Sequence, residues 1–133
     1  MSEDDHRLGE LSRRLLGLHA ALLEAERRVH EQTHGATTRA QLLRLVLDHE
    51  DFAWLRALSG LLARIDEALD AEGPAGDAET FFRETRQLLR SGAGTRFGTK
   101  YREALQRSPE VVMAHADVMR LLPPPDSATR EAS

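Results

Sequence analysis

The chain of 133 residues contains no cysteine. Disulfide bonds, thiolate metal sites and cysteine nucleophiles are therefore excluded. Aromatic residues make up only 5% of the sequence, so we expect a mainly aliphatic core. The sequence also lacks any run of about 18 consecutive apolar residues, which predicts that no segment spans a membrane. Lysine is scarce as well, since Lys100 is the only lysine among 18 basic residues.

The charge balance argues against a general nucleic-acid-binding protein. The formal net charge is -4, and the arginines are interspersed with acidic residues along the chain. Binding to phosphates requires basic side chains that are clustered on one surface. The first ten residues, MSEDDHRLGE, are acidic and polar, unlike a signal peptide. We therefore expect a cytoplasmic protein with neither a nucleic acid nor a membrane as its partner.

A regular series of apolar residues begins near the N-terminus. Its members are spaced alternately three and four residues apart: Leu8, Leu11, Leu15, Leu18, Leu22, Ala25 and Val29. This heptad spacing places the series on one face of a long helix that packs against other helices. The sequence thus predicts a helix over residues 4–34, which Gly35 ends in a left-handed conformation.

Five more helical segments follow, and each is bounded by helix start or stop signals. They span residues 38–48, 51–71, 77–90, 95–107 and 109–122. Thr38 and Gln41 have the spacing of a capping box, and Ser108 followed by Pro109 marks the start of the last helix. No alternating pattern indicates a strand. We therefore predict an all-α fold, a mainly antiparallel helical bundle of four long helices plus one or two short ones.

The sequence also predicts the extent of the domain and two features of its packing. A single helical-bundle domain covers residues 1–122, and the run of prolines that follows predicts a disordered tail over 123–133. Residues 38–48 are apolar nearly all round, so we expect this short helix to be deeply buried. The next helix is expected to bury the stripe formed by Leu55, Leu58, Leu62 and Ile65.

One group of residues has the chemistry of a metal site. Glu26, His30 and His34 recur every four residues, so they lie on one face of the first helix. Two imidazoles at this spacing can share a divalent metal, and a carboxylate can supply a third ligand. The favoured interpretation is a solvated helix end, where the helix dipole favours histidine, and the metal site is the alternative. The spacing also differs from the Glu-x-x-His motif of di-iron bundles.

A second polar cluster, residues 48–51 with the sequence DHED, separates two apolar helices. Its carboxylates and histidine can bind a cation or act as acid and base. The favoured interpretation is a capped junction in which Asp51 is the N-cap of the following helix.

Two further features have structural interpretations. The glycines at positions 92, 94 and 98 before Lys100 partly match a phosphate-binding loop. The Gly-Lys-Ser/Thr ending and a preceding strand are missing, so we expect loop glycines chosen for flexibility. His115 lies in an apolar stretch of the last helix, where we expect a hydrogen-bonded histidine of the core.

Several stretches resemble a family of uncharacterised bacterial proteins. They are FAWLRALS at 52–59, IDEAL at 65–69, YREALQR at 101–107 and VMAHA at 112–116. The resemblance covers most of the predicted folded part. It implies a bacterial, cytoplasmic, stand-alone domain, and it transfers no activity, cofactor or site residue.

The sequence contains no recognisable catalytic or cofactor-binding signature, and its serines lack the context of a nucleophile elbow. We therefore expect a non-enzymatic protein–protein interaction or regulatory module without a cofactor. Its partner would be another protein or a second copy of the chain. The alternative function is a metal- or small-ligand-binding bundle that uses His30, His34 and the nearby carboxylate of Glu26.

Overall fold

The protein is all-α, as the sequence predicts. A computed structural model describes residues 3–71 and 78–122, and every element within these ranges is helical. In chain order they are α1 (Glu3–His34), α2 (Arg39–Asp48), the 3₁₀ helix η1 (Glu50–Leu55), α3 (Arg56–Asp70), α4 (Ala78–Leu89), the 3₁₀ turn η2 (Gly92–Gly94), α5 (Arg96–Arg107) and α6 (Pro109–Met119). The predicted tail over 123–133 and the predicted helix start at residue 77 lie outside the described residues.

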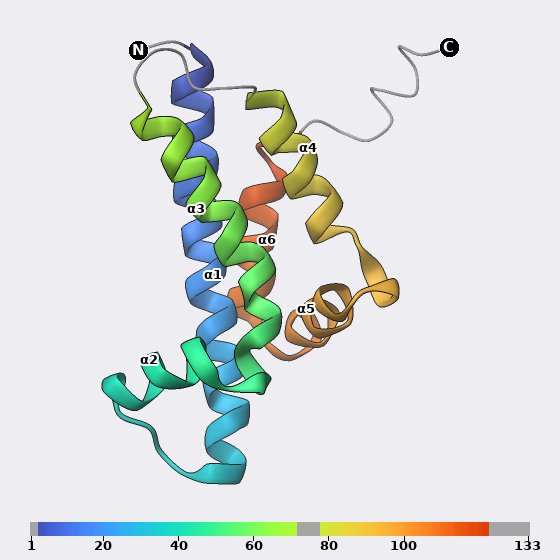
Figure 1. Cartoon of the computed structure of the whole chain (residues 1–133). Coiled ribbons are helices and arrows are strands. Elements are labelled where there is room, and N and C mark those ends of the chain that lie inside the picture. Colours follow the sequence, from blue (N-terminus) through green and yellow to red (C-terminus); the bar gives the residue numbers. More distant parts are fainter. Residues whose placement is uncertain (1–2, 72–77, 123–133) are drawn as a thin grey trace.

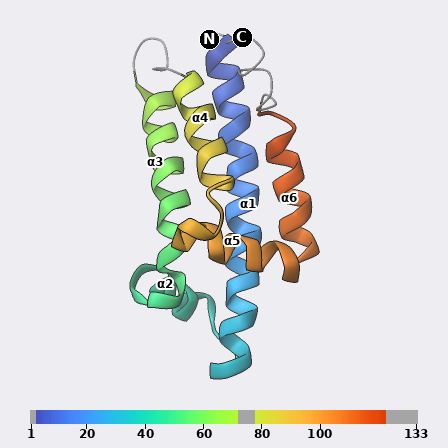
Figure 2. The same cartoon turned by 90° about the vertical axis from the view of Figure 1, so that its right-hand side faces the viewer.

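Helix α1 is the central element of the bundle (Figure 1). With 32 residues it is about 48 Å long at ~1.5 Å per residue. Helices α3, α4 and α6 lie along one part of it; α1 and α4 run in one direction, and α3 and α6 run in the other (Figures 1 and 2). Helix α5 lies across this direction (Figure 2). The C-terminal end of α1 extends beyond these helices, and α2 lies near it (Figure 1). No described helix is long and apolar enough to cross a membrane.

The core is aliphatic and lies along the predicted seam of α1. Leu8, Leu11, Leu15, Leu18 and Leu22 are all fully buried. The predicted stripe of the next helix is confirmed as well, since Leu55, Leu58, Leu62 and Ile65 are buried against it. Val29, the last residue of the seam, is only partly buried, because it lies on the part of α1 that extends beyond the bundle.

The predicted helix boundaries rest on capping chemistry that the structure confirms. Gly35 follows α1 with a φ of +82°, the left-handed conformation of a helix stop. The backbone N–H of Gln41 donates to Thr38 Oγ1 over 3.2 Å, and the Thr38 N–H donates to the Gln41 side chain over 2.9 Å. The Ser108 hydroxyl accepts from the N–H of Val111 at the start of α6.

Two expectations for the segment after α1 are wrong. Helix α2 is not deeply buried: none of its residues is buried, and Leu43 and Leu47 are 62% and 61% exposed. The helix packs mainly against η1 and faces the projecting end of α1 across a cavity, so only one of its sides has neighbours. Asp51 is not the N-cap of the next helix, because the chain first forms η1. His49 caps η1 instead, and its Nδ1 accepts from the Asp51 N–H over 3.0 Å.

Candidate functional site

The junction between the end of α1 and the start of η1 brings both polar clusters of the sequence together. After Gly35 the chain reverses, and the carboxylate of Glu31 accepts hydrogen bonds from the N–H and hydroxyl of Thr37 over 2.6 and 2.8 Å. The backbone N–H of Thr37, followed by its hydroxyl, lowers the pKa of the Glu31 carboxyl. This fixed turn and the capping box of α2 direct the chain back towards α1.

Three imidazole rings meet at this junction. His30 and His34 stack on the last turns of α1 with their ring centroids 4.2 Å apart. His49 approaches His30 edge-on from the other segment, at a centroid distance of 5.2 Å. The buried ring of Phe52 lies 5.8 Å from that of His30. As a result His30 is only 8% exposed, although it lies near the end of a projecting helix.

A carboxylate completes the cluster. The Oδ2 atom of Asp51 lies 3.8 Å from Nδ1 of His30 and 3.6 Å from Nδ1 of His49. Each of the three residues has one ligand-type atom within 4.8 Å of those of the other two. The Nδ1 atom of His30 is buried and has no hydrogen-bond partner among the described residues. Such an atom has lost water without gaining a partner, which is unfavourable in a folded protein.

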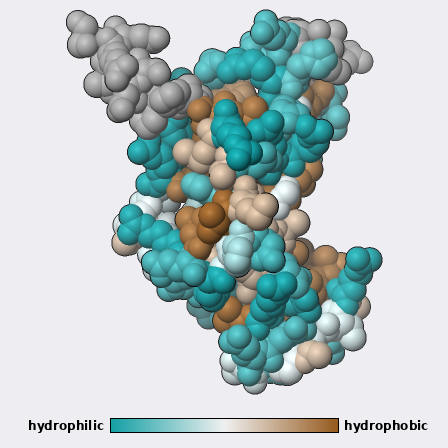
Figure 3. All heavy atoms as spheres, turned by 180° about the vertical axis from the view of Figure 1, so that it is seen from behind, coloured by the Kyte–Doolittle hydropathy of each residue, from teal (hydrophilic) through white to brown (hydrophobic). Residues whose placement is uncertain are grey.

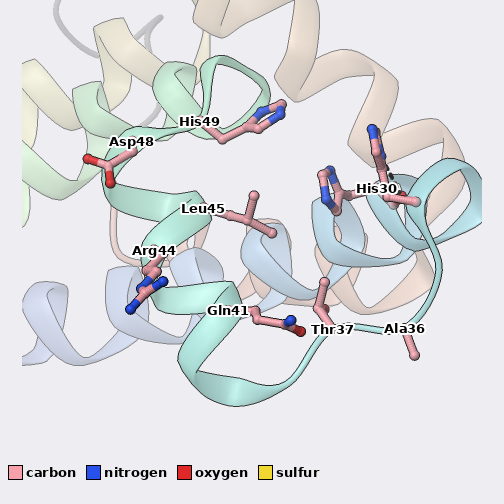
Figure 4. A pocket seen from close by; sticks show the side chains of 9 residues that line it. His30, Ala36, Thr37, Gln41, Arg44, Leu45, Asp48 and His49 are labelled. Atoms are coloured by element: carbon pink, nitrogen blue, oxygen red, sulfur yellow. Dashed lines mark hydrogen bonds between the residues drawn. The ribbon is translucent and has the colours of Figure 1, made fainter.

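A cavity of about 420 Å³ lies beside the cluster. It is lined by His30, His34, Ala36, Thr37, Gln41, Arg44, Leu45, Asp48 and His49. Figure 4 shows that Leu45 and Gln41 of α2 face α1 across this cavity, while the His49 ring points towards His30. The cavity walls thus combine apolar, polar and charged side chains with the imidazoles. This combination suits a small polar ligand or a bound ion.

The structure places the three metal-ligand candidates of α1 in different surroundings. Glu26 is buried, with an Oε2 atom 3.7 Å from Arg107 of α5, and it is not in the three-residue group. His34 is exposed, and its Nδ1 lies 3.2 Å from the carbonyl of His30 at the helix end. Only His30 belongs to the group, together with His49 and Asp51 from the second cluster. The sequence indicated both clusters, but it had no signal that the turn after α1 joins them.

The buried carboxyl of Glu26 predicts a pH-dependent stability. Burial raises its pKa above the ordinary value of 4.5, and Lys100 and Arg107 oppose this shift. The folded state therefore binds the proton more tightly than the unfolded state, so the wild type loses stability as pH rises through the folded pKa. We expect Glu26→Gln to gain stability relative to the wild type as pH rises above the ordinary glutamate pKa of 4.5. Urea denaturation at several pH values measures this difference; a pH-independent difference would contradict it.

The hydrogen bond predicted for His115 is confirmed, but the residue is only partly buried and does not belong to the core. Its Nδ1 lies 2.6 Å from the hydroxyl of Tyr101, a fully buried residue of α5. Burial lowers the pKa of His115, which favours the neutral ring. This pair holds α5 against α6, and we assign it no further role.

Comparison with protein-family models, with curated proteins and with solved structures finds no match. The resemblance to a family of uncharacterised bacterial proteins therefore stays a prediction. The functional argument depends on the side chains of the junction and of α2.

Proposed function

We propose that the protein is a non-enzymatic interaction module that pairs with a second copy through α2. The observation that supports this is the exposed apolar face of the helix. Ala40, Leu43 and Leu47 follow one another after three and four residues, so they share one face. Both leucines are more than 60% exposed. Figure 3 shows hydrophobic surface on the projecting arm to which α2 belongs, at the lower right.

The charges beside this face favour a second copy as the partner. Arg44 and Asp48 lie one turn apart on the same flank of the apolar face, and both are exposed. Neither forms an ion pair within the described residues. In an antiparallel pair of α2 helices related by a twofold axis, Arg44 of each copy lies beside Asp48 of the other. The same arrangement packs Leu43 against the partner's Leu47, so the face is complementary to itself.

The size of the face sets the expected strength of the pair. A helix of 10 residues is about 15 Å long, so the pair buries less than the ~1,200 Å² of a standard stable interface. We therefore expect a reversible dimer with a dissociation constant above about 10 µM. A weak dimer of this kind forms and dissociates with protein concentration, which is suitable for a regulatory module.

Sedimentation over a concentration series tests the pairing. We expect the wild type to pass from monomer to dimer between about 1 and 500 µM, and the double variant Leu43→Ser with Leu47→Ser to remain monomeric. Leu16→Ser is the matched control, because Leu16 is 52% exposed on α1 and its loss should leave the dimer unchanged. A wild type that is monomeric over the whole range would refute the pairing.

A charge exchange tests the antiparallel geometry separately. Arg44→Asp or Asp48→Arg alone places like charges beside each other across the twofold axis, so each should weaken the dimer. The double variant restores opposite charges in both pairs and should recover the wild-type dissociation constant. If the double variant stays as weak as the single ones, the two helices do not pair in this way.

A further inference from the structure

We infer that His30, His49 and Asp51 bind a divalent transition metal, with Zn²⁺ as the best match, at the junction of α1 and η1. Two imidazole nitrogens and one carboxylate oxygen are ligands that zinc prefers, and three protein ligands with one open position are typical of zinc sites that bind a further ligand. None of the three ligands lies on the apolar face of α2 or is one of its flanking charges, so metal binding can be tested independently of the proposed pairing.

The distances between the rings agree with a shared metal. Two imidazoles on one tetrahedral zinc, with Zn–N bonds of about 2.0 Å, have ring centroids about 5 Å apart. The centroids of His30 and His49 are 5.2 Å apart. Ligand atoms on such an ion lie about 3.3 Å from one another, and Asp51 Oδ2 lies 3.8 and 3.6 Å from the two Nδ1 atoms. Each of these oxygen–nitrogen distances therefore needs to shorten by only a few tenths of an ångström.

The unpartnered nitrogen of His30 is the second, independent observation. Its side chain is 6% exposed, and Nδ1 faces Asp51 Oδ2 at a distance too long for a hydrogen bond. A buried polar atom normally has a partner. A metal bound between His30 Nδ1 and Asp51 Oδ2 would give the buried nitrogen a partner. In the present arrangement the two atoms are too far apart to form a hydrogen bond with each other.

Metal binding at His49 requires the loss of one hydrogen bond. Its Nδ1 accepts from the N–H of Asp51, so a metal at this nitrogen replaces the hydrogen bond. Asp51 is exposed, which leaves its N–H accessible to water after the exchange. Both His30 and His49 also line the cavity beside α2. The open coordination position therefore faces a cavity large enough for water or for a small anionic ligand.

Calorimetric titration with Zn²⁺, together with the visible absorption of bound Co²⁺, tests the site on the chain without a histidine tag. We expect one metal per chain, with a tetrahedral Co²⁺ spectrum. His49→Gln and Asp51→Asn should each weaken binding at least about tenfold, since the loss of an outer partner alone costs that much. Neither side chain is buried, so both variants should fold, which circular dichroism checks.

The control variants distinguish this ligand set from other histidines. His34→Ala and Glu26→Gln should keep the wild-type affinity, because neither residue is in the group. His6→Ala is the matched control for an exposed histidine at the opposite end of α1. The inference is overturned if Asp51→Asn binds as tightly as the wild type, or if His34→Ala weakens binding as strongly as His49→Gln. It is also overturned if the wild type binds no Zn²⁺.

Discussion

Gly98→Ala is expected to lower the free energy of unfolding by about 3 kcal/mol, although alanine favours helices. Gly98 is buried in the first turn of α5, where the backbone of Gly92 in η2 lies against it. A Cβ atom at this position would lie 1.8 Å from the carbonyl oxygen of Gly92 and 2.6 Å from its nitrogen. Both groups are backbone, so no side chain can turn away to relieve the overlap. The expectation of glycines chosen for flexibility is therefore wrong at Gly98, where close backbone contact requires the residue.

Gly60→Ala is the matched control for this prediction. Gly60 also lies within a helix, but it is exposed and an added Cβ atom meets nothing within 4 Å. The greater helix propensity of alanine should therefore raise stability by up to about 1 kcal/mol. Chemical denaturation of both variants, followed by far-UV circular dichroism, measures the contrast. If Gly98→Ala is as stable as the wild type, α5 and η2 do not approach as closely as the structure shows.

The second large effect is expected for Leu58→Ala, which should lower the free energy of unfolding by about 2–5 kcal/mol. Leu58 is fully buried between α3 and α1, so the substitution removes apolar contacts and leaves a cavity. The surrounding helices are held by several other buried leucines and can close that cavity only in part. Urea denaturation at neutral pH gives the difference directly.

Leu43→Ala provides the comparison for the same chemical change. Leu43 belongs to an equally leucine-rich segment, but it is 62% exposed on α2. We expect a loss of less than about 0.5 kcal/mol, as for other surface substitutions. The measurement is made at a concentration at which the protein is monomeric, so that the stability of the dimer does not contribute to the free energy of unfolding. Similar losses at the two positions would show that α2 is packed more closely than the structure indicates.

The contrast between Leu58 and Leu43 shows that a local sequence pattern does not always determine which residues are buried. The heptad seam of α1 identified a buried face because one face is apolar and the other polar. In α2, apolar residues occur nearly all round, so the pattern predicts burial on every side. Burial requires neighbours, however, and η1 provides them on only one side of α2. Sequence periodicity contains no information about where neighbouring helices end.

The candidate metal site shows that sequence spacing also did not determine which polar side chains come together. His30 and the DHED segment were each recognisable from their residue types, and each had an acceptable structural interpretation on its own. The helix spacing associated His30 with Glu26 and His34, since residues four apart share a face. Tertiary contacts override this grouping: Glu26 turns to Arg107 of α5, and the chain reversal places His49 and Asp51 beside His30.

By itself, the sequence determined the helical class, the helix boundaries marked by Gly35, Thr38 and Ser108, and the core faces of α1 and α3. These features depend on interactions within a few residues or on a periodic pattern, and both can be read along the chain. Only the tertiary structure decided the exposure of Leu43, the need for glycine at position 98 and the grouping of His30 with His49 and Asp51. Each of these depends on the distance between segments that are not adjacent in sequence, which is set by how the helices pack.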